Sequence, residues 1–256
     1  MLKRSLLFLL SSLSLTVTAA QEEAPSRQRG QPDGVHAGLM MGIRTPLYVG
    51  EDTDTIIFPG LSAKRGPYYW NGPSAGADFW TVGPATIGPQ LYGRWQRFDN
   101  KDHPLLEGLA EPQITLEGGL RTRTRLGYTL LEIQALHDLL DRHDGGSALA
   151  ILRLAYPFKN GIRIGIAGGA RYQSGKMNDY YYGVPTNRAR EDRAAYRPGS
   201  TIHPEAQTLF MYTLNDNWSI RWTNRVEWLD EGIRNSPIVD EKILFRSLIG
   251  ATYRFY

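Results

Sequence analysis

The stretch KILFRSLIGATYRFY, residues Lys242–Tyr256, decides the fold class of this chain. Its odd-numbered positions are mostly apolar: Ile243, Phe245, Ser247, Ile249, Ala251, Tyr253 and Phe255. Its even-numbered positions form a mixed face with two charges: Leu244, Arg246, Leu248, Gly250, Thr252, Arg254 and Tyr256. Because successive strand side chains point to opposite faces, this pattern is typical of a membrane-spanning strand with lipid on one side and a wet interior on the other. The last strand of a soluble β-sandwich alternates in the same way, so this segment alone leaves both architectures open.

The amino terminus has the three parts of a secretory signal peptide. Lys3 and Arg4 form a short basic region, and residues 5–17 are an apolar run rich in leucine. The small residues that follow predict cleavage after Ala20, with Ala19 as the alternative last residue of the leader. We therefore expect a signal peptide over residues 1–20, a flexible periplasmic lead-in over 21–33 and one folded domain over 34–256.

Composition excludes several classes of protein. The chain has no cysteine, which excludes a lipoprotein anchor and disulfide bonds. The formal net charge of +3 includes Lys3 and Arg4 of the leader, and no basic tract follows, so we expect no nucleic-acid partner. A membrane-spanning helix needs about twenty consecutive apolar residues, and no stretch after the leader approaches that length.

Segments of alternating polarity recur along the mature chain, which carries all 14 tyrosines and all six tryptophans. They predict an all-β protein, a closed antiparallel transmembrane β-barrel of about twelve strands, with ten as the alternative. The expected strands are Val35–Leu47, Thr55–Pro59, Gly66–Trp70, Ala77–Val82, Thr86–Arg97, Gln113–Arg123, Leu126–His137, Ala148–Phe158, Ile162–Tyr172, His203–Leu214, Trp218–Leu229 and Lys242–Phe255.

The clearest alternation lies between Trp218 and Trp228. One face has three tryptophans, two of them near the strand ends, as in the aromatic girdles at the two lipid interfaces. The opposite face is polar and charged, and a charge facing lipid near the midplane costs about 2–4 kcal/mol. On this reasoning the side chains expected to line the lumen are Glu117, Arg121, Arg163, Arg171, Arg221, Arg225, Glu227 and Arg246.

The lengths of the connections give an independent argument for the barrel. Outer-membrane barrels have short periplasmic turns and longer outer loops. From Thr86 onward, long and tight links alternate strictly, and the longest is Gln173–Ile202. Asn160-Gly161 and Asn215-Asp216-Asn217 are good hairpin formers because Asn and Gly tolerate positive φ. A soluble sandwich has no reason to separate loop lengths in this way.

Three motifs contain residue types that could carry chemistry. Gly72–Gly76 matches the G-x-S-x-G pattern of hydrolases, but the residues after Gly76 resemble a strand rather than the required helix, and an ordinary loop explains them. The His/Asp cluster at residues 137–144 has potential metal ligands, but a charged surface loop between two strands is the favoured interpretation. Tyrosines at 180–182 open the longest loop, where they can pack over the barrel rim. The length of this loop favours a functional role, and a solvated lid is an equally good interpretation of it. We predict no catalytic, metal or cofactor site.

Four segments occur in an order that resembles one known family. They are Pro46-Leu47-Tyr48-Val49-Gly50, Tyr181-Tyr182-Gly183-Val184, Ser236-Pro237-Ile238-Val239 and the terminal Tyr253-Arg254-Phe255. Together with the signal peptide they resemble the MipA/OmpV family of outer-membrane proteins, over essentially the whole mature chain. The resemblance singles out Tyr181, Tyr182 and Gly183 as the candidate loop motif.

The family resemblance implies location more firmly than activity. It implies a barrel in the outer membrane of a Gram-negative bacterium, in contact with lipid, non-enzymatic, and monomeric or loosely associated. One member is associated with a scaffold that joins a murein-degrading transglycosylase to a murein synthase. Others are described as porin-like or adhesive. The expected function is a scaffold of a peptidoglycan-remodelling complex, with a small-solute channel or a surface adhesin as alternatives.

Overall fold

The computed structural model describes residues 33–53, 55–96 and 98–256. The predicted signal peptide and residues 21–32 of the predicted lead-in lie outside the described residues. No helix in the described part of the chain is long and apolar enough to cross a membrane.

The described chain is almost entirely β-structure. Ten strands have 10–13 residues: β1 (Gly34–Arg44), β2 (Thr55–Arg65), β6 (Ala85–Arg94), β7 (Thr115–Leu126), β8 (Thr129–Asp138), β9 (Gly146–Pro157), β10 (Ile162–Gln173), β11 (Thr201–Thr213), β12 (Trp218–Trp228) and β13 (Ile243–Arg254). Three are short: β3 (Tyr68–Asn71), β4 (Ser74–Ala77) and β5 (Trp80–Val82). The helical segments are α2 (Gly175–Tyr182), the 3₁₀ turn η2 (Thr186–Arg188) and α3 (Glu231–Arg234).

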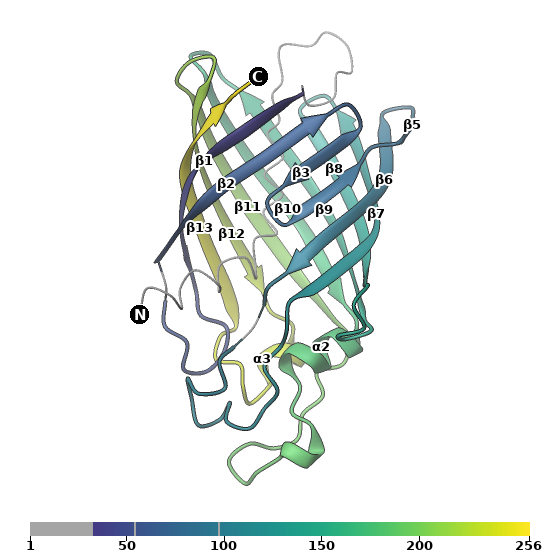
Figure 1. Ribbon diagram of the computed structural model, residues 1–256, viewed down its shortest axis with the longest axis vertical. Coiled ribbons are helices and arrows are strands. Elements are labelled where there is room, and N and C mark those ends of the chain that lie inside the picture. Colours follow the sequence, from purple (N-terminus) through teal and green to yellow (C-terminus); the bar gives the residue numbers. More distant parts are fainter. Residues whose placement is uncertain (1–32, 54, 97) are drawn as a thin grey trace.

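The strands close into an antiparallel barrel (Figure 1). Each long strand from β6 to β13 pairs with its neighbours in sequence, and β13 then pairs with β1. On the other side β1 pairs with β2, β2 with β3, β3 with β4, and β4 with β6. Twelve strands therefore form the ring, and β5 is an additional short strand beside β6. The prediction of a closed antiparallel barrel of about twelve strands is confirmed.

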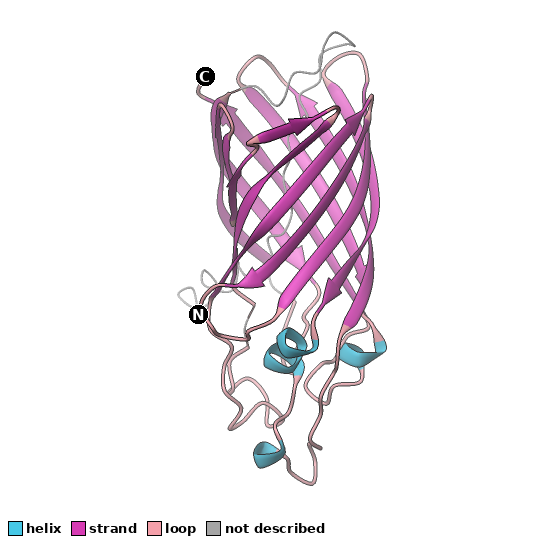
Figure 2. Ribbon diagram, turned by 90° about the vertical axis from the view of Figure 1, so that its right-hand side faces the viewer, coloured by secondary structure: helices cyan, strands magenta, loops and turns pink. Residues whose placement is uncertain are grey.

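Connection length separates the two ends of the barrel. Two-residue to four-residue turns join β7 to β8, β9 to β10 and β11 to β12 at one end, here named the turn end, at the top of Figure 1. The long connections and the helices of the described residues gather at the opposite end, the loop end (Figure 2). In the turn between β9 and β10, Asn160 (φ 65°) and Gly161 (φ 76°) both adopt the left-handed conformation that hairpins need.

The side chains of each long strand alternate between an apolar exterior and a polar interior. On β12, the exposed fractions of Trp218, Trp222 and Trp228 are 44%, 46% and 43%, whereas Arg221 and Arg225 on the other face are buried. At the turn end, aromatic side chains form edge-to-face contacts on the outer surface, between Tyr68, Phe79 and Trp80, between Tyr128, Tyr156 and Phe158, and between Trp218, Tyr253 and Phe255. Such a ring is typical of a membrane–water interface.

The sequence-based boundaries were wrong in one region, between β2 and β6. Strand β2 extends to Arg65 rather than Pro59, β4 lies in a segment expected to be a loop, and only Trp80–Val82 of the expected strand Ala77–Val82 forms β5. In residues 60–65 and 72–77 most side chains are small or polar, so the alternation there has little hydrophobic contrast. Ser74 begins a strand and no helix follows it, so the context that a nucleophile elbow requires is missing there.

The alternation on β12 predicts how this strand tolerates charge. We expect Trp222→Arg, near the middle of the strand, to lower the free energy of unfolding by about 2–4 kcal/mol, and Trp218→Arg, at the strand end, by about 0–1 kcal/mol. Urea unfolding of the barrel in lipid vesicles measures both. Equal tolerance at the two positions would contradict the assignment of this face to the lipid core.

Candidate functional site

The loop end is closed by a folded hydrophobic core, here named the loop cap. Its buried residues come from the β1–β2, β6–β7, β10–β11 and β12–β13 connections: Leu47, Tyr48, Phe98, Leu106, Leu109, Met177, Tyr181, Tyr182, Val184, Leu229, Ile233, Ile238 and Val239. Figure 2 shows α2 and α3 lying across this end of the barrel. A core of this kind gives the connections a fixed structure, in contrast to a solvated lid.

Helix α2 is part of the loop cap, and residues at both of its ends favour the start and the end of a helix there. The Ser174 side chain accepts a hydrogen bond from the Met177 backbone N–H, which caps the first turn. The same hydroxyl accepts a bond of 2.9 Å from the Gly146 N–H at the start of β9. Gly183 ends the helix, where a Cβ would lie only 2.3 Å from the Asp179 carbonyl oxygen. These contacts hold α2 against the rim of the barrel.

Two tyrosines of the loop cap share one hydrogen-bond donor. The Gln96 amide donates to the hydroxyl of Tyr48 at 3.0 Å and to that of Tyr182 at 2.8 Å. Tyr48 in turn donates to the Tyr181 carbonyl oxygen at 3.1 Å. Burial raises the pKa of Tyr182 to about 12 and that of Tyr48 well above its ordinary value. Both phenols are therefore neutral at any physiological pH and act as hydrogen-bonding members of the core.

The segments singled out by the family resemblance meet in the loop cap. Tyr48 and Val239 form a β-bridge, and the Ser236 hydroxyl donates to the Tyr182 carbonyl oxygen at 2.6 Å. Val184 forms a second bridge, with Tyr196 of the same long loop. Sequence reasoning did not predict this contact between residues about 190 positions apart, because no local pattern encodes it.

Beneath the loop cap, Glu117 is the centre of a buried polar network. Arg94 donates to both oxygens of its carboxylate, at 2.5 and 3.2 Å, and the Ser147 hydroxyl donates to it at 3.2 Å. His143 Nε2 lies 3.8 Å from the same carboxylate. A 3.0 Å hydrogen bond between the hydroxyls of Tyr181 and Thr115 joins Tyr181 to β7, the strand that carries Glu117. The network therefore connects the candidate loop motif to the barrel wall.

A second network lies on the inner wall of the barrel, along the neighbouring strands β10, β11 and β12. Arg225 donates to Glu205 and to Glu227, each at 2.6 Å, and Arg171 lies 3.5 Å from Glu205. Arg246 is the register partner of Arg225 on β13. Glu205 was not singled out from the sequence, because a proline and an alanine beside it break the alternation of β11. The structure thus brings Arg171, Arg225 and Glu227 together around a carboxylate that sequence reasoning missed.

Further networks lie toward the turn end. Arg121 and Arg123 both bind the Asp78 carboxylate, the former at 3.0 Å, and Arg121 stacks 3.8 Å above the ring of Tyr69. Arg163 and Arg221 are both buried, and the nearest polar contact of Arg221 is the Met211 sulfur at 3.8 Å. The candidate lumen residues therefore belong to several separate clusters rather than to one site.

The His/Asp cluster has a structural explanation. The Asp138 carboxylate accepts hydrogen bonds from the backbone N–H groups of Leu140, Arg142, His143 and Asp144, at 2.6–3.1 Å. It therefore holds the β8–β9 loop in its tight conformation. Among the described residues, no group of three or more His, Asp or Glu side chains is placed to hold a metal ion.

Ser74, the central residue of the G-x-S-x-G motif, lies in a row of amide side chains. Its hydroxyl accepts a hydrogen bond from Gln90 at 3.1 Å, and the same Gln90 amide donates to Gln134 at 3.0 Å. No histidine contacts this serine in the described part of the chain. The arrangement supplies polar packing along the inner wall of the barrel rather than an activated nucleophile.

The Glu117 network predicts a stability difference between two similar substitutions. We expect Glu117→Gln to lower the free energy of unfolding by about 3–5 kcal/mol, because it leaves Arg94 buried without a carboxylate partner. The control is Glu231→Gln, which removes the exposed pair with Arg234 and is expected to cost less than about 1 kcal/mol. Urea unfolding in lipid vesicles measures both, and similar values for the two variants would contradict the assignment.

Comparison with known proteins identifies the family. The family described as MltA-interacting protein MipA matches residues 37–255. Outer membrane protein OmpV of Vibrio cholerae is 27% identical over 175 residues, which cover 66% of this chain and 65% of OmpV, slightly less than two thirds of its length. The MltA-interacting protein of Escherichia coli is 25% identical over 223 residues, 85% of this chain and 89% of that protein.

Among solved structures, the COG4313 outer membrane channel of Pseudomonas putida is 12% identical, with 91% of this chain and 100% of that chain covered and a TM-score of 0.45. A similarity this low carries no argument. The match over residues 37–255 spans nearly the whole barrel. The relatives named above include an outer-membrane protein and an interaction protein. The chain therefore belongs to the MipA/OmpV family and is a β-barrel protein of the outer membrane.

Proposed function

We propose that this barrel is a non-enzymatic scaffold that holds a peptidoglycan-remodelling enzyme against the inner face of the outer membrane, as a monomer or a loose oligomer. The observation that supports it most is the relationship to a protein named for its interaction with MltA, over 85% of this chain. Family membership over residues 37–255 supports the same assignment.

The closed loop end favours a scaffold over an open pore. The loop cap buries aromatic and aliphatic side chains across one mouth of the barrel, and ion pairs between neighbouring strands lie on the inner wall below it. A solute moving along the barrel axis would have to displace the cap and pass these charged side chains. A partner would therefore bind to the exposed surfaces of the barrel.

The turn end is the surface that a periplasmic partner would meet, because outer-membrane barrels place their short turns in the periplasm. Arg65 and Lys159 are exposed there beside the outward aromatic ring, and Asp33 and Asp216 are exposed at the same end. The two basic side chains suit acidic groups on a partner, since complementary charge raises the association rate.

The binding experiment uses the mature barrel in lipid nanodiscs and a soluble form of the lytic transglycosylase from the same cell envelope. We expect saturable binding that weakens as salt rises, and a several-fold loss of affinity in Lys159→Glu at the turn end. The matched control is Lys176→Glu, an exposed lysine at the loop end that pairs with Asp144. No binding by the folded barrel, or equal losses in the two variants, would contradict the proposal.

The alternative functions make different predictions. A small-solute channel would conduct ions in a planar bilayer, whereas the loop cap and the lumen ion pairs lead us to expect no stable conductance steps from the intact barrel. The control is to verify that the barrel used for insertion is folded, which its heat-dependent migration on a gel shows. Regular conductance steps would favour the channel. Binding to host cells without binding to envelope enzymes would favour an adhesin.

A further inference from the structure

The barrel wall is incomplete between β2 and β6. Strands β3 and β4 have only four residues each, so β3 pairs with Ser62–Arg65 of β2. The last bond toward the loop end runs from the Gly72 N–H to the Leu61 carbonyl oxygen at 3.1 Å. Beyond it, residues 55–60 of β2 pair with β1 but with no other strand of the described chain. Figure 1 shows the β3–β4 hairpin filling only the upper part of the space between β2 and β6.

The sequence of this open edge is suited to being left unpaired. The Leu61 carbonyl points toward the hairpin, so the backbone groups of Pro59 and Ile57, two and four residues away, point to the same side. Pro59 has no N–H to donate, and proline at such a position blocks the addition of another strand. Backbone groups in a membrane protein must nevertheless be satisfied, so the opening has to contain water or a bound molecule.

A cavity of about 120 Å³ reaches this opening from the lumen. Its lining includes Pro59, Leu61 and Gly72, at the edge of the opening. One water needs roughly 10–15 Å³ on this measure, so the cavity has room for several waters or part of an alkyl chain. The cavity is therefore continuous with the opening between β2 and β6.

One side of the cavity is apolar. Met40, Phe58 and Leu248 line it and, with Ile56, form a buried hydrophobic cluster on the inner face of the wall. On the outer face of β2, Ile57 and Leu61 face the lipid side, and their exposed fractions are 53% and 39%. Apolar surface therefore continues from the outside of β2, past its open edge, into the lumen.

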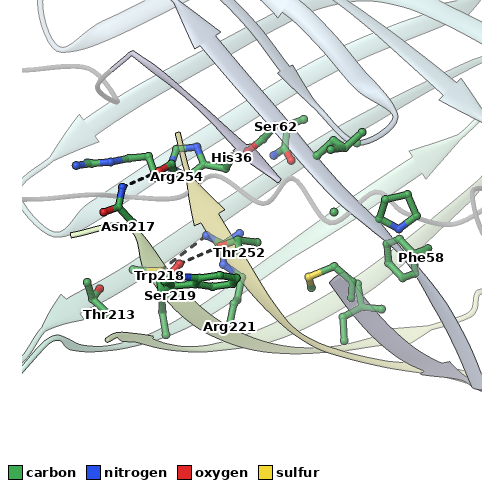
Figure 3. Close-up of a pocket in the computed structure, with 18 of the residues that line it drawn as sticks. His36, Phe58, Ser62, Thr213, Asn217, Trp218, Ser219, Arg221, Thr252 and Arg254 are labelled. Atoms are coloured by element: carbon green, nitrogen blue, oxygen red, sulfur yellow. Dashed lines mark hydrogen bonds between the residues drawn. The ribbon is translucent and has the colours of Figure 1, made fainter. Parts of the chain in front are cut away.

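The other side of the cavity carries a buried cation. Arg221 is 7% exposed, its Nε has no hydrogen-bond partner, and its terminal nitrogen contacts only the Met211 sulfur, at 3.8 Å. No described carboxylate forms an ion pair with it. The other titratable residues that line the cavity are His36, Asp216 and Arg254. Figure 3 shows Phe58 on β2 and, across the cavity, Ser219, Arg221 and Thr252 on β12 and β13.

We propose that this cavity binds a single-chain anionic amphiphile of the fatty-acid class, which enters from the membrane between β2 and β6. The carboxylate pairs with Arg221, whose buried charge otherwise lacks a partner, and the alkyl chain lies along Phe58, Met40 and Leu248 toward the opening. An apolar solute without charge leaves Arg221 unsatisfied, and a small hydrophilic anion gains nothing from the apolar side. This site is independent of the proposed scaffold function.

The charge requirement is tested by titrating the folded barrel, in an uncharged detergent, with dodecanoate and with dodecanol. We expect dodecanoate to bind, and Arg221→Gln to weaken it by roughly tenfold or more, since hydrogen bonds to charged groups are the strong ones. Dodecanol should bind more weakly and equally to both forms. Arg65→Gln, which removes one exposed charge at the far end of β2, is the matched control. No dodecanoate binding, or equal weakening by Arg65→Gln, would overturn the proposal.

The cavity itself is tested by filling it. A Cβ on Gly60 would lie 2.7 Å from Met40 Cγ, so Gly60→Leu places its side chain in the cavity. We expect it to abolish binding of both compounds. The control is Gly168→Leu, because nothing lies within 4 Å of a Cβ at that position. Folding of each variant is checked by heat-dependent gel migration, and unchanged binding in folded Gly60→Leu would place the alkyl chain elsewhere.

The lateral route is tested with a single cysteine, because the chain has none. A bulky thiol reagent on Pro59→Cys, at the open edge, should slow the uptake of dodecanoate from lipid vesicles at least several-fold. The same reagent on Ile164→Cys, which faces outward from β10, should not. Equal rates for the two labelled proteins would exclude entry between β2 and β6.

Discussion

The constraint on which the rest of this structure depends is the pairing of backbone polar groups in a medium without water. Each unpaired N–H or C=O in hydrocarbon costs several kcal/mol, so a sheet in lipid has to close. Closure makes β1 a partner of β13 and fixes the register of every strand between them. The alternation of each sequence segment follows from that register, because a shift of one residue would turn tryptophans inward and arginines toward lipid.

The interior shows how a barrel of this size manages buried charge. Arginines from several strands lie in the lumen, and two carboxylates each serve two of them: Asp78 pairs with Arg121 and Arg123, and Glu205 pairs with Arg171 and Arg225. Arg221 is outside these groups, and it lines the cavity together with Arg254. A buried arginine outside the ion pairs therefore lies beside the incomplete wall.

The sequence was sufficient to predict the barrel architecture but not the structure of the loop cap. Trp218, Trp222 and Trp228 on one face of β12 specify a strand in lipid, and Asn160-Gly161 specifies the turn before β10, because both signals are local. Strand β4 was missed because Ser-Ala-Gly-Ala has no large outward side chain. Helix α2 was missed because its buried residues, Met177, Asn178, Tyr181 and Tyr182, are defined by contacts with distant loops. The cavity combines residues of β1, β2, β11, β12 and β13, which no segment alone could indicate.

The loop cap also spans the seam where the first and last strands meet. Thr45 N–H donates to the Phe245 carbonyl at 2.9 Å, and Asp240 N–H donates to that of Leu47 at 3.2 Å, so both connections flanking the seam are held together beyond the sheet. These contacts join segments from opposite ends of the sequence, and they can form only after the intervening strands are in place. The cap is therefore expected to form late in folding and to act as a latch. Its stability would slow the opening of the β1–β13 seam while leaving the rate of barrel assembly nearly unchanged.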